Sequence, residues 1–287
     1  MSTIHFVGGE KGGVGKSVVS RLLSQYFLDN GLLYAGFDAD QSHATLTHSY
    51  PEFTQPIVLD DFESIDQLIE LASEDDKKQL LVDLPAQSQR FLERWLEDSG
   101  VLEICAELGL KTLFWYVVDG GRDSVMLLRA FQQKYGGSMP FVVVRNFGCG
   151  GDFSDIDQVI AEAQAAQLLA VVDIPALHPA TLQRIDKLGL SFWSAINLKS
   201  ADGAQLSMME RQRTKVWLRK ASQSIDAALQ QQMPDALIID AKLPGALPPT
   251  PPWPLPANRA GRIIAGRSAI TSSAAWSRSP IRPRPGT

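Results

Sequence analysis

The amino-acid sequence predicts an α/β fold in which a mostly parallel, twisted sheet carries helices on both faces. Over the first 240 residues, short apolar runs alternate with helical patterns, as a chain of strand–helix–strand units requires. A glycine-rich segment joins the first apolar run to the first helical pattern, an arrangement suited to holding phosphate groups. An apolar fraction of 45% and a charged fraction of 21% are ordinary for a globular protein with a sizeable core.

The predicted strands and helices follow one another along the chain. Strands are expected at 4–7, 33–37, 79–84, 112–118, 141–145 and 168–174. Helices are expected near 17–29, 64–73, 88–107, 123–135, 154–167 and 179–188. A last helix is expected from about 204 to 231, because apolar side chains recur there near one face.

The beginning of the chain and its cysteine content favour a cytoplasmic protein without membrane association. No apolar run reaches the roughly 18 residues that a membrane-spanning helix needs. The first residues are strand-like and lack the basic and apolar stretches of a signal peptide. The two cysteines, Cys105 and Cys149, give no disulfide framework and fit a reducing compartment.

From Leu243 onward the composition changes. Positions 248–256 read PPTPPWPLP, which excludes a helix or a central strand. The rest of this segment is rich in Ala, Ser, Arg and Pro and has no sustained periodicity. We therefore predict a folded domain over 1–240 and a disordered tail over 241–287, although a tail without function, as a frameshift would leave, fits equally well.

Charge is distributed unevenly between these two parts. Residues 1–239 hold 20 basic and 31 acidic residues, a formal net charge of −11, whereas residues 240–287 carry +6. An acidic body weakens the case for DNA binding by the folded domain and leaves the basic tail as the better candidate. The other candidates lie in the last helix, where helical spacing favours an ordinary solvated face; they are Arg211, Arg213, Lys215, Arg219 and Lys220.

Residues 10–17 (EKGGVGKS) form a phosphate-binding loop between the first predicted strand and the first predicted helix. Glycines let successive backbone N–H groups turn inward, and the helix N-terminus adds positive partial charge. We expect Lys16 to reach the β- and γ-phosphates and the Ser17 hydroxyl to ligate Mg²⁺. The sequence thus predicts a P-loop NTPase fold that binds Mg-ATP. The expected nucleotide-binding residues of the loop are Gly12, Gly13, Val14, Gly15, Lys16 and Ser17.

This loop departs from the standard pattern, because Glu10 holds the place of the first glycine and Lys11 follows it. It resembles the deviant Walker A loop of the ParA/MinD family of ATPases, whose distinguishing residue is this early lysine. The resemblance implies a homodimer in the ATP state, in which Lys11 contacts the phosphates of ATP held by the partner subunit. A second cation near the γ-phosphate would neutralise charge that develops during transfer.

Two predicted strands end in carboxylates. Asp38 and Asp40 follow the strand at 33–37, and their spacing of two places both side chains on one side. The family has an Asp-x-Asp here, so the resemblance implies that Asp38 supports the water shell of Mg²⁺ and that Asp40 positions or activates the attacking water. A solvated turn is the alternative. Asp83 resembles the family's second acidic motif, where the acid holds a Mg²⁺-bound water.

The strand at 141–145 is followed by Asn146, which stands where the family commonly has an adenine-reading amide. An amide both donates and accepts hydrogen bonds, which suits a purine edge. A local turn before Gly148 explains the same residue nearly as well. The base-binding role of Asn146 is therefore an expectation drawn from the resemblance.

A narrower resemblance is to nucleotide-binding proteins of the conjugal-transfer TraL type. It depends on four short segments, at 4–5, 118–121, 174–177 and 208–215. The resemblance implies an ATPase with slow, partner-stimulated hydrolysis that recruits an unidentified protein in DNA partition or transfer. The alternative is an ATP-dependent small-molecule ligase of the same fold, such as dethiobiotin synthetase, but Lys11 favours the switch because those enzymes generally lack it.

Overall fold

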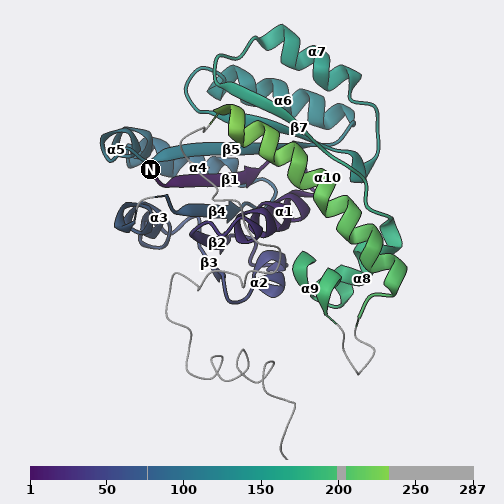
Figure 1. The fold of residues 1–287 in the computed structure, drawn as a ribbon. Coiled ribbons are helices and arrows are strands. Elements are labelled where there is room, and N and C mark those ends of the chain that lie inside the picture. Colours follow the sequence, from purple (N-terminus) through teal and green to yellow (C-terminus); the bar gives the residue numbers. More distant parts are fainter. Residues whose placement is uncertain (76, 199–204, 233–287) are drawn as a thin grey trace, which may run out of the picture. The chain divides into compact units, whose positions relative to one another are not determined.

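The computed structural model of this chain describes residues 1–75, 77–198 and 205–232 (Figure 1). All strand pairs in its single sheet are parallel, in the order β3-β2-β4-β1-β5-β6-β7. The strands are β1 (Thr3–Gly8), β2 (Tyr34–Asp38), β3 (Thr54–Pro56), β4 (Gln79–Asp83), β5 (Lys111–Val118), β6 (Phe141–Asn146) and β7 (Leu168–Ile174). The predicted α/β class and parallel sheet are confirmed.

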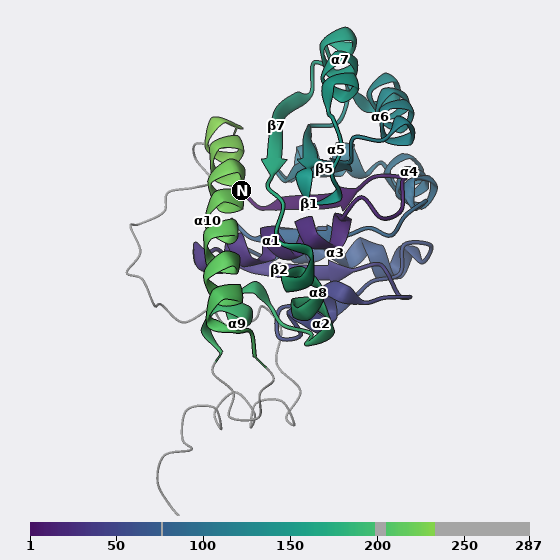
Figure 2. The ribbon, with the colours of Figure 1, turned by 90° about the vertical axis from the view of Figure 1, so that its right-hand side faces the viewer.

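Helices cover both faces of the sheet, as predicted. Figure 2 shows α1, α9 and α10 on one side and α4 and α6 on the other. The helices are α1 (Lys16–Asp29), α2 (Thr45–Ser49), α3 (Phe62–Glu74), α4 (Gln89–Asp98), α5 (Val101–Glu107), α6 (Arg122–Tyr135), α7 (Ser154–Ala163), α8 (Pro179–Lys187), α9 (Phe192–Asn197) and α10 (Met208–Gln232). A 3-10 turn at Phe147–Cys149 follows β6.

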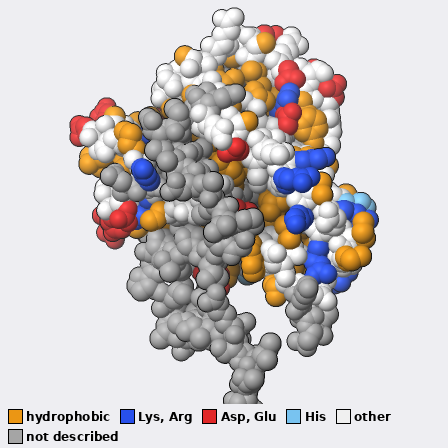
Figure 3. Space-filling view, in the orientation of Figure 1, with side chains coloured by type: hydrophobic (Ala, Val, Ile, Leu, Met, Phe, Trp, Pro, Cys, Tyr) orange, Lys and Arg blue, Asp and Glu red, His pale blue; other side chains and the backbone are white. Residues whose placement is uncertain are grey.

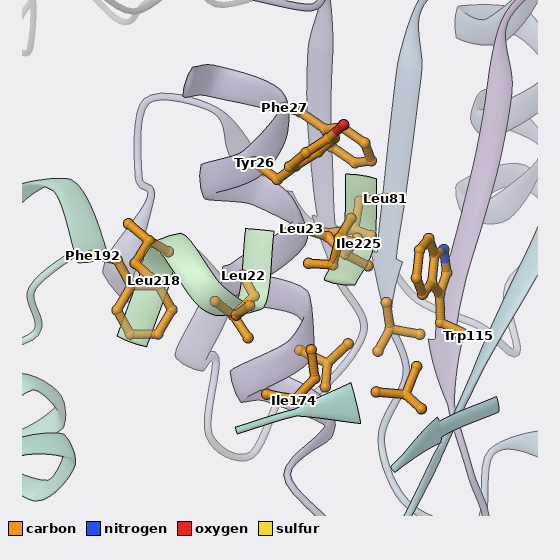
Figure 4. Close-up of a cluster of buried hydrophobic side chains, with 14 of the residues drawn as sticks. Leu22, Leu23, Tyr26, Phe27, Leu81, Trp115, Ile174, Phe192, Leu218 and Ile225 are labelled. Carbon is orange, nitrogen blue, oxygen red and sulfur yellow. The ribbon is translucent and has the colours of Figure 1, made fainter. Parts of the chain in front are cut away.

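The core on the first face forms where α1 and α10 pack on the strands. Leu22 and Leu23 of α1 lie beside Ile225 of α10, with Trp115 of β5 facing them from the sheet (Figure 4). All four side chains are essentially inaccessible to solvent. Since each buried aliphatic side chain contributes about 1.5–3 kcal/mol, this packing fixes the helix that follows the glycine-rich loop.

Aromatic rings dominate the second face. Phe6 of β1 meets Trp95 of α4 edge-on at 6.4 Å between ring centroids. Phe131 of α6 lies 4.5 Å from Tyr116 and 5.0 Å from Phe114, both on β5. The indole N–H of Trp95 is buried and donates to Asp66 at 2.7 Å, so its polar group is satisfied.

Several boundaries differ from those predicted. The predicted helix 88–107 is two helices, because Gly100 adopts a left-handed φ of 58° between α4 and α5. The predicted helix 154–167 ends at Ala163, where Gln164 takes a left-handed φ of 44°. The sequence patterns also missed α2, β3 and α9, each too short to show a period. The domain boundary at 240 and the tail at 241–287 lie outside the described residues.

One buried histidine sits in the centre of the sheet. The Trp115 indole N–H donates to His5 Nδ1 at 3.1 Å, so the His5 Nε2–H donates to Gln79 Oε1 at 2.9 Å. Burial lowers the pKa of His5 to about 4, against a weaker opposing effect of Gln79. The ring is therefore neutral in the folded protein.

Acid is expected to destabilise the protein through this ring. Because the folded pKa lies below the ordinary 6.5, the unfolded chain binds more protons between these values, and stability falls as pH drops through them. Urea midpoints at pH 7 and pH 5 should show a smaller drop for His5→Gln than for the parent. His43→Gln, at an exposed position, is the control. An equal drop in both variants would contradict the assignment.

Candidate functional site

The glycine-rich loop leaves β1 at Gly8 and enters α1 at Lys16. Gly15 precedes the helix with a left-handed φ of 90°, and a Cβ there would lie 2.2 Å from the amide nitrogen of Asn146. Only glycine fits this position. The Gly15 carbonyl accepts the N–H groups of Val18 and Val19, at 3.0 and 3.1 Å, which starts α1 directly after the loop. The loop therefore sits at a helix N-terminus, where anions are favoured.

Lys16 lies inside the loop and is only 8% exposed. Its ammonium donates to the Lys11 carbonyl at 2.9 Å, its one hydrogen bond to the described residues. Burial lowers the pKa of Lys16, and the charge of Asp83 is the largest effect opposing this shift. An ammonium has three N–H donors, so two of them are available for phosphate oxygens.

The predicted carboxylates meet at the ends of neighbouring strands. Asp38 of β2 pairs in register with Asp83 of β4, and both are almost fully buried. Asp38 accepts the backbone N–H groups of Asp40 and Thr47, at 3.1 and 3.0 Å. Burial raises the pKa of Asp38 despite these hydrogen bonds. The sheet thus brings together two acids that are 45 positions apart in the sequence.

Asp83 differs from Asp38 in having one buried carboxylate oxygen without a hydrogen bond to the described residues. Its Oδ1 accepts the Ser20 hydroxyl at 2.8 Å, whereas Oδ2 is buried with no hydrogen-bond partner among the described residues. Burial raises the pKa of Asp83 to about 7; the Ser20 hydrogen bond opposes this shift and the charge of Asp38 adds to it. A buried acceptor without a partner is costly, so this oxygen is poised to receive a donor or a cation.

These features fit the hydrated Mg²⁺ predicted from the sequence. Magnesium keeps several waters and needs one or two carboxylates, so Asp38 and Asp83 would hold it through water and Ser17 would ligate it. The described residues contain no group of three or more His, Cys, Asp or Glu side chains that could hold a metal ion. Such an all-protein cage is not what magnesium requires, and Asp83 Oδ2 is the acceptor that its water shell would satisfy.

Asp40 occupies a local turn. Its Oδ1 accepts the backbone N–H groups of Ser42 and His43, at 3.0 and 3.2 Å, and its Oδ2 lies 3.1 Å from His43 Nδ1. Its side chain is 23% exposed, so water reaches it. The geometry thus shows the turn that was the alternative from the sequence, while the charge of Asp40 still lies close enough to act on Lys16.

Asn146 ties β6 to the loop. Its Nδ2 donates to the Val14 carbonyl at 2.8 Å, and its Oδ1 accepts the Gly148 N–H at 3.0 Å. The Cys149 thiol adds a contact to the Gly13 carbonyl at 3.4 Å. Both ends of the Asn146 amide are engaged within the protein, and its base-reading role remains a prediction.

A pocket of about 400 Å³ opens beside this segment. The residues that line it come from the ends of β6 and β7 and from α10; they are Phe147, Asp173, Pro175, Ala176, Lys220 and Ser224. Of these residues, sequence reasoning assigned a role to Lys220 alone, and as a candidate for DNA binding rather than for this pocket. The carbonyl of Pro175 accepts the Trp217 indole N–H at 2.6 Å, which fixes this wall of the pocket to α10.

The two charged residues that open the loop contact the segments on either side of it. Lys11 Nζ lies 2.9 Å from both carboxylate oxygens of Asp119, which follows β5. Glu10 Oε1 accepts the backbone N–H of Gln89, the first residue of α4, at 2.9 Å. Sequence reasoning missed both contacts, although Asp119 stands at a strand end, as Asp38 and Asp83 do.

Several exposed basic side chains lie on α10. Figure 3 shows Lys and Arg side chains on the right of this view, where Figure 1 places α8 and α10. The exposed basic residues of α10 are Arg213, Lys215, Arg219 and Lys220, and Arg211 is half-buried. Within the described ranges, no helix is both long and apolar enough to cross a membrane.

Comparison with known proteins gives relatives in sequence and in structure. No protein-family model matches the chain. The Escherichia coli protein TraL is 28% identical over 240 residues, which cover 79% of this chain and 99% of TraL. Protein MobD of Acidithiobacillus ferrooxidans is 28% identical over 131 residues, covering 45% of this chain and 57% of MobD. A solved MinC:MinD cell division protein complex from Aquifex aeolicus is 14% identical, with a TM-score of 0.49, covering 87% of this chain and 100% of that chain.

The phosphate loop with its early lysine, the parallel sheet and the match to almost the whole of TraL agree with one another. The chain resembles the P-loop ATPases of the ParA/MinD type, and among them it is similar to the TraL proteins.

Proposed function

We propose that the chain binds Mg-ATP, hydrolyses it slowly and uses the ATP state to form a homodimer that recruits a partner protein. The observation that carries this proposal is the position of Lys16. Its buried ammonium lies at a helix N-terminus, close enough to Asp83, Glu10 and Asp40 for the charges of these acids to act on it. A triphosphate with a divalent cation matches this arrangement of one buried cation, helix dipole and paired acids.

Each group has a defined part in the proposed reaction. Lys16 and the loop N–H groups bind the β- and γ-phosphates, and Asp40 orients the attacking water at the open side of the site. When bound, Mg²⁺ would neutralise phosphate charge, with Ser17, Asp38 and Asp83 as its direct or water-mediated partners. The pocket lined by Phe147, the residue after Asn146, would receive the base.

Lys11→Ala is expected to separate ATP binding from dimerisation. The proposed target of Lys11 is ATP held by the second subunit, so the chain's own loop keeps its contacts and ATP affinity should change by less than about threefold. The ATP-dependent dimer and ATP turnover should both fall by roughly tenfold or more, as expected when a cation is removed from a transferring phosphoryl group. Calorimetry, light scattering and phosphate release measure the three quantities.

The matched control is Lys215→Ala, which removes an exposed lysine far from the loop in sequence. It should leave all three quantities unchanged. If Lys11→Ala dimerises and turns over ATP at the parent rate, the in-trans role of Lys11 is wrong.

An ATP-dependent small-molecule ligase is the alternative function. The proposed switch should hydrolyse ATP slowly without any metabolite, and its rate should rise when DNA or a partner protein is added. The similarity to TraL and MobD supports a setting in plasmid partition or conjugal transfer for this partner. A turnover that requires a metabolite and is indifferent to macromolecules would favour the ligase.

A further inference from the structure

Lys11 forms a partly buried ion pair with Asp119 instead of extending freely into solvent. Its ammonium lies 2.9 Å from each oxygen of the Asp119 carboxylate, and the two side chains are only 26% and 20% exposed. Asp119 follows β5, which is the sheet neighbour of β1, so the contact joins the starts of two adjacent loops.

The carboxylate that receives Lys11 is itself held in place. Asp119 Oδ1 accepts the Ser124 hydroxyl at 2.6 Å and the Gly121 backbone N–H at 3.1 Å. Burial acts to raise the pKa of Asp119, but the hydrogen bonds from Lys11 and Ser124 outweigh it and lower the pKa. The carboxylate is therefore charged while it holds Lys11, and the Ser124 hydroxyl and the Gly121 N–H orient it.

Gly121 leaves room for the ammonium. A Cβ added at this residue would lie 2.7 Å from Lys11 Nζ, closer than nonbonded atoms approach. The backbone φ of Gly121 is −86°, which any residue adopts, so its small size rather than its flexibility matters here. Asp119, Gly121 and Ser124 together form a receptor for the ammonium of Lys11 within the same chain.

We propose that Asp119 is an ionic latch, which keeps Lys11 on its own subunit and must release it before Lys11 can reach ATP bound by a second copy. This inference rests on the proposed function, because it assumes that Lys11 acts across the dimer. Asp119 is a positioning residue, since it acts only through Lys11. Only chains whose Lys11 is released can then complete the dimer. The apparent dissociation constant of the dimer is therefore larger than the intrinsic one, and it grows as the fraction of released chains falls.

The latch predicts that weakening its receptor tightens the dimer. Asp119→Asn removes the charge with little change of shape, and Gly121→Ala displaces the ammonium without changing any charge. Breaking a partly exposed ion pair should shift the equilibrium between held and released Lys11 by about two- to fivefold in each chain. Because both subunits must release Lys11, the dissociation constant of the dimer with a non-hydrolysable ATP analogue should fall by roughly four- to 25-fold.

A direct readout of Lys11 separates the latch from a merely structural role. Limited acylation of lysines, followed by mass spectrometry of the peptide that contains Lys11, should show about two- to fivefold faster labelling in Asp119→Asn and Gly121→Ala. Lys215 serves as the internal standard in the same digest. Asp123→Asn is the control variant, since it makes the same charge change two residues beyond Gly121 at an exposed position outside the receptor. It should alter neither labelling nor dimerisation.

The outcomes distinguish this inference from the function it rests on. Faster labelling together with a tighter dimer in both variants supports the latch. Unchanged labelling of Lys11 in both variants overturns it, as does faster labelling with an unchanged dimer when the parent protein dimerises with the ATP analogue. A parent that binds no ATP, or that binds it without dimerising, overturns the proposed function and the latch together. Thermal unfolding of each variant confirms that it is folded.

Discussion

Lys16→Ala should reduce the affinity for ATP by at least about a hundredfold, the largest loss of nucleotide binding expected of any substitution proposed for this protein. Hydrogen bonds between an ammonium and phosphate oxygens are charge-assisted, and removing the donor leaves anionic oxygens without their strongest partner. The loop backbone, held by Gly15 and Asn146, would keep its shape in the variant. Calorimetric titration with ATP and Mg²⁺ measures the loss.

The control for this substitution is again Lys215→Ala, which makes the same change of charge on the exposed face of α10. Because Lys16 is buried, the thermal midpoint of Lys16→Ala must be compared with that of the parent before the affinity is interpreted. A folded Lys16→Ala protein that binds ATP as tightly as the parent would refute the assignment of the phosphate site.

Asp40→Ala should slow hydrolysis by about a hundredfold or more while leaving ATP affinity within about threefold of the parent. A group that positions or activates water acts on the chemical step, and general bases of this kind contribute roughly 10²–10⁴ in rate. The ATP-dependent dimer should consequently persist for longer. Single-turnover phosphate release and light scattering over time measure the two effects.

A second variant separates the loss of the Asp40 charge from the loss of the local turn that Asp40 holds. Asp40→Asn keeps an oxygen that can accept the N–H groups of Ser42 and His43, so the turn survives while the charge is lost. This variant should hydrolyse as slowly as Asp40→Ala, whereas the exposed control Asp60→Asn should behave like the parent. Parent-like hydrolysis by Asp40→Asn would make Asp40 a turn residue only.

The parts of the fold and the site that local patterns encode were predictable from the sequence. The six longer strands, the phosphate loop and the acids at the ends of β2 and β4 each follow from runs of a few residues. Parallel pairing then brings Asp38 and Asp83 to one edge without further information. The short edge strand β3 carried too little periodicity, and the break between α4 and α5 depends on one left-handed glycine.

The contacts that the sequence could not supply join residues far apart in the chain. Lys11 and Asp119 are separated by 108 positions, and Glu10 and Gln89 by 79. Both contacts depend on which strands flank β1, and that order emerges only when the whole sheet assembles. Asp119 follows an apolar strand, as Asp38 and Asp83 do, so treating every acid at such a strand end as a candidate would have found it.

The mass of the protein in solution tests most directly whether ATP drives this chain into a dimer. Size-exclusion chromatography with light scattering should be run with Mg-ADP and with Mg²⁺ and a non-hydrolysable ATP analogue, at the same protein concentration. The proposal predicts the mass of one chain with ADP and of two chains with the analogue. The same mass with both nucleotides would contradict it.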